Sequence, residues 1–251
     1  MRFQQWRYAI ALSSVTLLTA CGGGSGSSDD SSSPGNGDAA GIYEGTTGDN
    51  RELLGALLPN GDYYVIYTGG PANDQIGGFV RGSGTPSNGS FTSTDGTDFN
   101  FEGSGQSPVT VSASYRTRNS LSGTISGAGG SNTFTSTYSA EYEKTPSLQA
   151  IARTYVGVVQ DAAGDTVANV TVATNGTITG TTATGCNVSG DVEPARRGNT
   201  YDLNLAISGA SCAANGLALI GVVLHDTTDN SIVAAASDAS NSYGLVFLGI
   251  E

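Results

Sequence analysis

Short runs of alternating apolar and polar residues, ended by glycine or asparagine turns, recur along the body of this chain. Clear examples are SFTST at 90–94, TFTSTY at 133–138 and YDLNL at 201–205. Alternation with a period of two is typical of β-strands that have one face in water. The strand signals recur about every 8–12 residues, with turns such as Asn60-Gly61 and Asn175-Gly176 between them. This spacing favours antiparallel barrels or sandwiches over folds with crossover helices.

The second half of the chain gives the more regular count of strands. Eight candidates lie at roughly 154–160, 166–173, 177–182, 184–192, 200–208, 217–225, 231–237 and 242–250. We expect them to close into a barrel, because closure removes unpaired strand edges. Residues 41–143 offer eight or nine more strands. We therefore predict an all-β chain with two small antiparallel up-and-down β-barrel or barrel-like domains.

One segment near the middle departs from the strand pattern. Residues 145–152 read TPSLQAIA. This is typical of a short helix, with Thr145 as N-cap and Pro146 at the first helical position. We interpret it as the junction between the two barrels.

The first twenty-one residues have the pattern of an export signal. A basic start precedes an apolar run at 8–18, which is too short to span a membrane. The run ends in Leu18-Thr19-Ala20-Cys21, which resembles the lipobox of bacterial lipoproteins. The resemblance implies that the chain is cleaved before Cys21 and that Cys21 is lipidated. Inner-membrane lipoproteins often have Asp at the next position. By the same resemblance, Gly22 favours anchoring in the outer membrane, at its periplasmic face or at the cell surface. The alternative is an ordinary secretory signal that ends near a cysteine.

The segment after Cys21 is rich in Gly, Ser and Asp up to residue 40. It has little to bury, so we expect a flexible tether. The predicted layout is a signal peptide (1–20), a lipidated cysteine with its tether (21–40), a first barrel-like domain (41–144), a linker helix (145–153) and a second barrel (154–251).

Charge and cysteine count limit the classes of partner. Residues 21–251 hold eight basic and 22 acidic side chains, a net charge of −14. This balance excludes nucleic acid as a partner and disfavours broad contact with anionic lipid. With Cys21 used for lipid, Cys186 and Cys212 remain as an even pair outside the cytoplasm, which predicts a disulfide.

No motif for catalysis or metal binding stands out. We interpret the single histidine, His225, as a solvated residue at a strand end rather than a member of a catalytic triad. Asp161–Asp165 and Asp226–Asn230 fit turns, with weak calcium sites as the alternative. Glu141 and Glu143, on one face of a predicted strand, are the most suggestive pair for glycoside hydrolysis. We expect no catalytic residue, no metal site and no cofactor.

Aromatic residues supply the candidate binding surface. Tyr63, Tyr64, Tyr67 and Phe79 lie on neighbouring predicted strands. Tyrosine is enriched at interfaces, so we take these four as candidate residues for a ligand or partner. The alternative is packing between the two domains or around a barrel.

The start of each half also carries a resemblance. Gly41-Ile42-Tyr43, and Arg153-Thr154-Tyr155 after the helix, resemble the opening of lipocalin-type barrels, with Tyr in place of Trp. The whole layout looks like the small barrels of surface lipoproteins related to transferrin-binding protein B. We expect a non-catalytic, outer-membrane-anchored lipoprotein with a binding or adaptor role toward an envelope protein or small ligand. The alternatives are a lipocalin-like carrier of a small apolar ligand and an unrecognised hydrolase.

Overall fold

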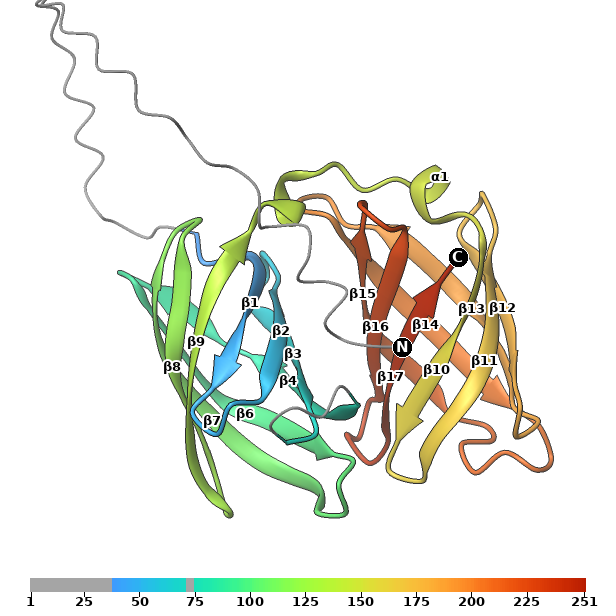
Figure 1. The fold of residues 1–251 in the computed structure, drawn as a ribbon, viewed down its shortest axis with the longest axis horizontal. Helices are drawn as coiled ribbons and strands as arrows, with labels where there is room; N and C mark the ends of the chain where they lie inside the picture. The colour runs from blue at the N-terminus through green and yellow to red at the C-terminus, as the bar shows by residue number, and fades with distance from the viewer. Residues whose placement is uncertain (1–37, 71–74) are drawn as a thin grey trace, which may run out of the picture.

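The computed structural model describes residues 38–70 and 75–251. The predicted signal peptide, Cys21 and most of the predicted tether lie outside these residues. The all-β prediction is confirmed, because the described chain forms two closed antiparallel barrels that lie side by side (Figure 1). Within the described residues, no helix is both long enough and apolar enough to cross a bilayer.

The first barrel is built from the strands between residues 41 and 139. They are β1 (Gly41–Thr47), β2 (Glu52–Leu57), β3 (Asp62–Thr68), β4 (Ile76–Ser83), β5 (Thr85–Ser87), β6 (Ser90–Asn100), β7 (Gly105–Arg116), β8 (Ser120–Gly127) and β9 (Gly130–Ser139). Pairing of β1 with β9 and of β4 with β6 closes the wall, and the short β5 pairs only with β6. Neighbours otherwise follow chain order, as expected for an up-and-down barrel.

The second barrel follows the predicted strands closely. They are β10 (Thr154–Asp161), β11 (Gly164–Val172), β12 (Thr177–Thr182), β13 (Asn187–Pro194), β14 (Thr200–Ser208), β15 (Ala218–Asp226), β16 (Ser231–Asp238) and β17 (Gly244–Ile250). Each strand pairs with the next in sequence, and β10 pairs with β17 to close the ring. The disulfide joins Cys186 to Cys212 beside β13 and after β14, with Cα atoms 4.9 Å apart, as predicted.

The junction segment differs from the prediction in three details. The helix α1 (Leu148–Ile151) is shorter, and Ser147 rather than Thr145 caps it, since its Oγ accepts a hydrogen bond from the Ala150 N–H at 3.2 Å. Glu141 and Glu143 do not lie on a strand, because they belong to the 3₁₀ helix η2 (Ala140–Glu143). The prediction that these two carboxylates share one face of a strand is therefore wrong.

The first strand of each barrel begins in the same way. Tyr43 and Tyr155 are both fully buried, and each donates its hydroxyl hydrogen to a carbonyl four residues earlier. The acceptors are Ala39 O at 2.7 Å and Ile151 O at 3.1 Å. Ala39 and Ala40 are buried as well, so the last part of the predicted tether belongs to the packed structure. The folded part thus begins before Gly41.

Alternation along the strands gives each barrel an inner apolar face and, on one side, an outer apolar face. The outer faces of β1–β4 and β6 pack against those of β15–β17, which face them in Figure 1. The side chains buried in this interface come from both barrels and include Ile42, Leu54, Tyr64, Ile66, Phe79, Phe99, Val222, Leu224, Val233 and Val246. At about 25 cal/mol per Å² of buried apolar surface, such a contact holds the two barrels together.

Candidate functional site

The structure separates the four predicted aromatic residues onto two faces of the first barrel. Tyr63 is buried inside the barrel, and Tyr67 packs against the same inner cluster. Tyr64 and Phe79 lie in the interface with the second barrel and are 6% and 0% exposed. The four side chains therefore form no common exposed surface. Tyr64 and Phe79 instead pack between the two domains, which was the alternative interpretation.

The interface aromatics are held by close and specific contacts. Phe79 stacks on Phe99 with ring centroids 4.6 Å apart, and Gly244 of β17 lies directly against this pair. The Arg81 guanidinium lies 5.5 Å from the Tyr64 ring centroid and donates a hydrogen bond to Ser237 Oγ of the second barrel at 2.6 Å. These contacts fix the position of one barrel against the other.

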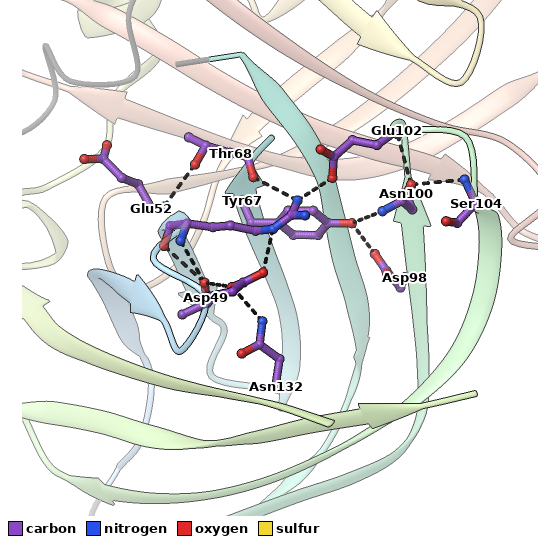
Figure 2. Close-up of polar contacts among 11 residues, drawn as sticks. Asp49, Glu52, Tyr67, Thr68, Asp98, Asn100, Glu102, Ser104 and Asn132 are labelled. Atoms are coloured by element: carbon purple, nitrogen blue, oxygen red, sulfur yellow. Dashed lines mark hydrogen bonds and ion pairs between the residues drawn. The ribbon is translucent and has the colours of Figure 1, made fainter. Parts of the chain in front are cut away.

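Tyr67 belongs to a polar network at one end of the first barrel (Figure 2). Its hydroxyl donates to Asp98 Oδ1 at 2.7 Å, and the Arg51 guanidinium lies 5.7 Å from its ring centroid. Arg51 also pairs with Asp49 at 2.9 Å and with Glu102. Each of these polar groups has a partner within the network. The network therefore links strands of the first barrel and leaves few polar groups to bind a ligand.

Burial and hydrogen bonding shift the pKa values in this network in opposite directions. Burial raises the pKa of Tyr67, and the neighbouring Asp98 carboxylate raises it further. Burial also raises the pKa of Asp98. For Asp49, burial alone raises the pKa, but hydrogen bonds from Thr47, Asn132 and Arg51 outweigh it and lower the value to about 2. The ion pair between Asp49 and Arg51 therefore persists in mildly acidic solution.

The interiors of the two barrels are filled by side chains. A cavity of about 30 Å³ remains in the first barrel, lined by residues such as Tyr43 and Phe91. One of about 50 Å³ remains in the second, lined by residues such as Val159 and Phe247. Pockets for small molecules measure roughly 300–1,000 Å³. These interiors are too small for the ligand of a lipocalin-like carrier.

A larger hollow lies at the junction of the two barrels. This junction cleft has a volume of about 520 Å³. Its lining residues are Asp38, Ala40, Thr117, Arg118, Tyr138, Tyr142, Glu143, Lys144, Thr145, Pro146, Arg196, Arg197 and Gly198. They come from the chain entry before β1, the β7–β8 turn, the end of β9 with the segment that follows it, and the β13–β14 loop. Neither barrel alone forms the cleft.

The junction cleft is held open by contacts between its walls. The Tyr142 carbonyl accepts a hydrogen bond from Asn199 N–H at 3.1 Å, which ties η2 to the β13–β14 loop. Glu141 accepts a hydrogen bond from Thr227 Oγ1 at 3.1 Å and pairs with Lys144 at 2.6 Å. The bonds from Asn199 to Tyr142 and from Thr227 to Glu141 join the segment after β9 to the second barrel, so the cleft walls are fixed by the fold.

The prediction for His225 is wrong, because this side chain is buried rather than solvated. It is 2% exposed and shares the inward face of β15 with Leu219 and Val223. Neither ring nitrogen has a hydrogen-bond partner within the described part of the chain. Burial, with Arg153 nearby, lowers the pKa of His225 below its usual 6.5. The ring is therefore neutral near pH 7, and it does not line the junction cleft.

The predicted acidic segments form turns. Asp161 Oδ1 accepts a hydrogen bond from Ala163 N–H at 2.7 Å, and Asp226 Oδ1 accepts one from Thr228 N–H at 2.8 Å. Such bonds to the following backbone are typical of aspartate in turns. Among the residues that the structure describes, no three His, Cys, Asp or Glu side chains gather as a metal site.

Comparison with known proteins shows a distant structural likeness. No family model matches the sequence, and no curated protein matches it. The fold is similar in part to the crystal structure of isotype 1 transferrin binding protein B from serogroup B Neisseria meningitidis. The TM-score is 0.28 at 10% identity, over 79% of this chain and 51% of that one. This chain spans about half the length of that protein, and a likeness at this level carries no argument about function.

Sequence reasoning did not find the junction cleft. Its walls are far apart in sequence, and only the fold brings them together. One signal was present in the adjacent Arg196 and Arg197, which are unusual in a chain with so few basic residues.

Proposed function

We propose that this chain is an outer-membrane-anchored lipoprotein with a non-catalytic binding or adaptor role at the cell envelope. The observation that carries the binding role is the contrast between filled barrel interiors and the junction cleft built by both barrels. Binding then takes place on the outside of a rigid two-barrel body. The lipobox-like Leu18-Thr19-Ala20-Cys21 supports the anchoring.

The non-catalytic part of the proposal is supported by the placement of the candidate catalytic groups. The His225 ring is enclosed in the second barrel. Glu141 is engaged by Lys144 and Thr227, and Glu143 by Arg118 and Tyr138. A general acid or base needs to reach a substrate proton within hydrogen-bond distance, and neither the enclosed His225 ring nor Glu141 is placed to do so.

Anchoring is tested by replacing the lipid-bearing residue. Wild type is expected to incorporate labelled palmitate and to fractionate with the outer membrane, whereas Cys21→Ser loses both. Equal labelling of the two proteins would overturn lipidation at Cys21. Cys186→Ala with Cys212→Ala serves as the matched control, since it removes two thiols and leaves the lipobox intact.

The binding role is tested by photo-crosslinking in intact cells, followed by mass spectrometry. A photoreactive residue at Thr117, in the junction cleft, is expected to capture one defined envelope component. The same residue at Thr181, exposed on β12 and outside the cleft lining, is the control and is expected to capture none. Capture at neither position, or the same products at both, would contradict a partner at the cleft.

A further inference from the structure

We propose that the junction cleft binds the phosphate group of an anionic ligand. This inference rests on the proposed binding role and names the ligand chemistry of its site. Three observations support the inference: the positive charge of the cleft, the weakness of the ion pairs inside it, and a buried tyrosine hydroxyl in its wall.

The charge of the junction cleft is opposite to that of the rest of the molecule. Four of the eight basic residues in 21–251 line it, although the net charge of that stretch is −14. They are Arg118, Lys144, Arg196 and Arg197. Two carboxylates, Asp38 and Glu143, leave the lining with a net charge of +2. At physiological salt the Debye length is about 8 Å, so distant acidic groups are screened while charges inside the cleft act together.

The ion pairs inside the cleft are weak enough to be exchanged for a ligand. Arg118 Nε lies 3.1 Å from Glu143 Oε1, with the two side chains 70% and 44% exposed. Arg197 pairs with Asp38. Exposed pairs of this kind contribute about 0–1 kcal/mol. Arg196 is exposed and has no ion pair within residues 38–70 and 75–251.

Arginine suits a phosphate ligand in particular. Its planar guanidinium donates two parallel hydrogen bonds to a pair of phosphate oxygens. Arg118 comes from the first barrel, and Arg196 and Arg197 come from the second. A phosphate between them would accept bonds from both barrels at once, and this explains why the basic side chains gather at the junction rather than on one barrel.

A tyrosine in the cleft wall supplies a second, independent observation. Tyr142 lines the cleft and is 4% exposed, and its hydroxyl has no hydrogen-bond partner in the described part of the chain. A buried donor without an acceptor costs about 1–3 kcal/mol. An acceptor oxygen of a bound ligand would remove this cost.

The phosphate has two possible sources, a lipid headgroup or a soluble phosphorylated molecule. Asp38, at the edge of the cleft, lies 17 residues after Cys21. Even a fully extended chain of that length spans only about 60 Å. The anchored protein therefore meets lipid headgroups as well as soluble ligands, and the experiment separates the two.

The test uses the lipidated protein purified in a non-ionic detergent. Inorganic pyrophosphate is titrated by calorimetry, and short-chain phosphatidylglycerol is compared with short-chain phosphatidylcholine. Arg196→Gln is expected to weaken binding by about fivefold or more, equivalent to about 1 kcal/mol. Arg116→Gln, an exposed arginine on β7 outside the cleft lining, removes the same charge and is expected to leave binding unchanged.

Each outcome decides the question. Binding of pyrophosphate without phosphatidylglycerol supports a soluble ligand, and binding of phosphatidylglycerol without phosphatidylcholine supports an anionic headgroup. No binding of either probe, or equal weakening by Arg196→Gln and Arg116→Gln, overturns the phosphate site. A defined crosslink from Thr117 without phosphate binding would keep the proposed binding role and refute only this inference.

Discussion

Gly244 is the position at which the contact between the barrels can be tested most directly. It begins β17, and a Cβ placed there would lie 2.6 Å from Phe99 Cδ1 and 2.9 Å from the Phe79 ring. Carbon atoms in contact sit about 3.5–4.0 Å apart. Gly244→Ala therefore forces the stacked rings of the first barrel away from the second. Overpacking of this kind costs about 1–3 kcal/mol of the free energy of unfolding.

A matched glycine provides the control. Gly55→Ala, on β2, would place its Cβ 3.7 Å from Val65 Cγ2, which is an ordinary contact. That variant is expected to be neutral, or more stable by about 0.4–1 kcal/mol because alanine restricts the unfolded chain. Urea denaturation followed by far-ultraviolet circular dichroism measures both variants against wild type.

A double-mutant cycle then isolates the contact. Phe79→Ala alone is expected to cost about 3–5 kcal/mol, because the ring is fully buried. In that background Gly244→Ala should cost less than it does in wild type, with a coupling of about 0.5–3 kcal/mol. Additive effects, or a cost for Gly244→Ala no greater than that for Gly55→Ala, would refute the packing described for the interface.

Three further predictions concern single groups. Burial lowers the pKa of His225 in the folded protein, so below pH 6.5 the imidazole takes up a proton more readily in the unfolded chain, and the free energy of unfolding falls. His225→Leu should flatten this pH dependence in urea titrations across pH 5–8. Reduction of Cys186–Cys212, 26 residues apart, should cost about 3.5 kcal/mol and lower the calorimetric Tm. Burial alone raises the pKa of Asp238, but hydrogen bonds from residues 240–243 lower it to about 2. Its contribution of about 2 kcal/mol should be present above pH 3.8 and lost toward pH 2, where Asp238→Asn and wild type converge in acid denaturation.

The second barrel shows how much of the fold was predictable. Its strands have one face inside and long stretches of the other in water, so the local pattern reports both the strand and its register. The predicted strand at 200–208 is found at Thr200–Ser208, and that at 177–182 at Thr177–Thr182. The turn at Asn175-Gly176 was equally clear, because Gly176 adopts a φ of +86° that favours glycine.

The site was less predictable, because its features depend on contacts between distant segments. Alternation along a strand places the adjacent residues Tyr63 and Tyr64 on opposite faces, but it does not show that the second barrel covers the outer face of β3. His225 looked like a rim residue because a turn follows it, yet it occupies the last inward position of β15 and is enclosed there. The junction cleft has no local pattern at all apart from Arg196 and Arg197.

The way in which the second barrel closes has a consequence for the order in which the chain can fold during synthesis. Its first strand, β10, is completed only by β17, the last strand of the chain. Until Gly244–Ile250 emerges, β10 and β16 both present unpaired edges, and one wall of the barrel interface is missing. A chain that stops a few residues early therefore lacks more than a tail, since it loses the closing strand of one barrel and part of the support of the other. Completion of both barrels therefore depends on Gly244–Ile250, the strand that is synthesised last.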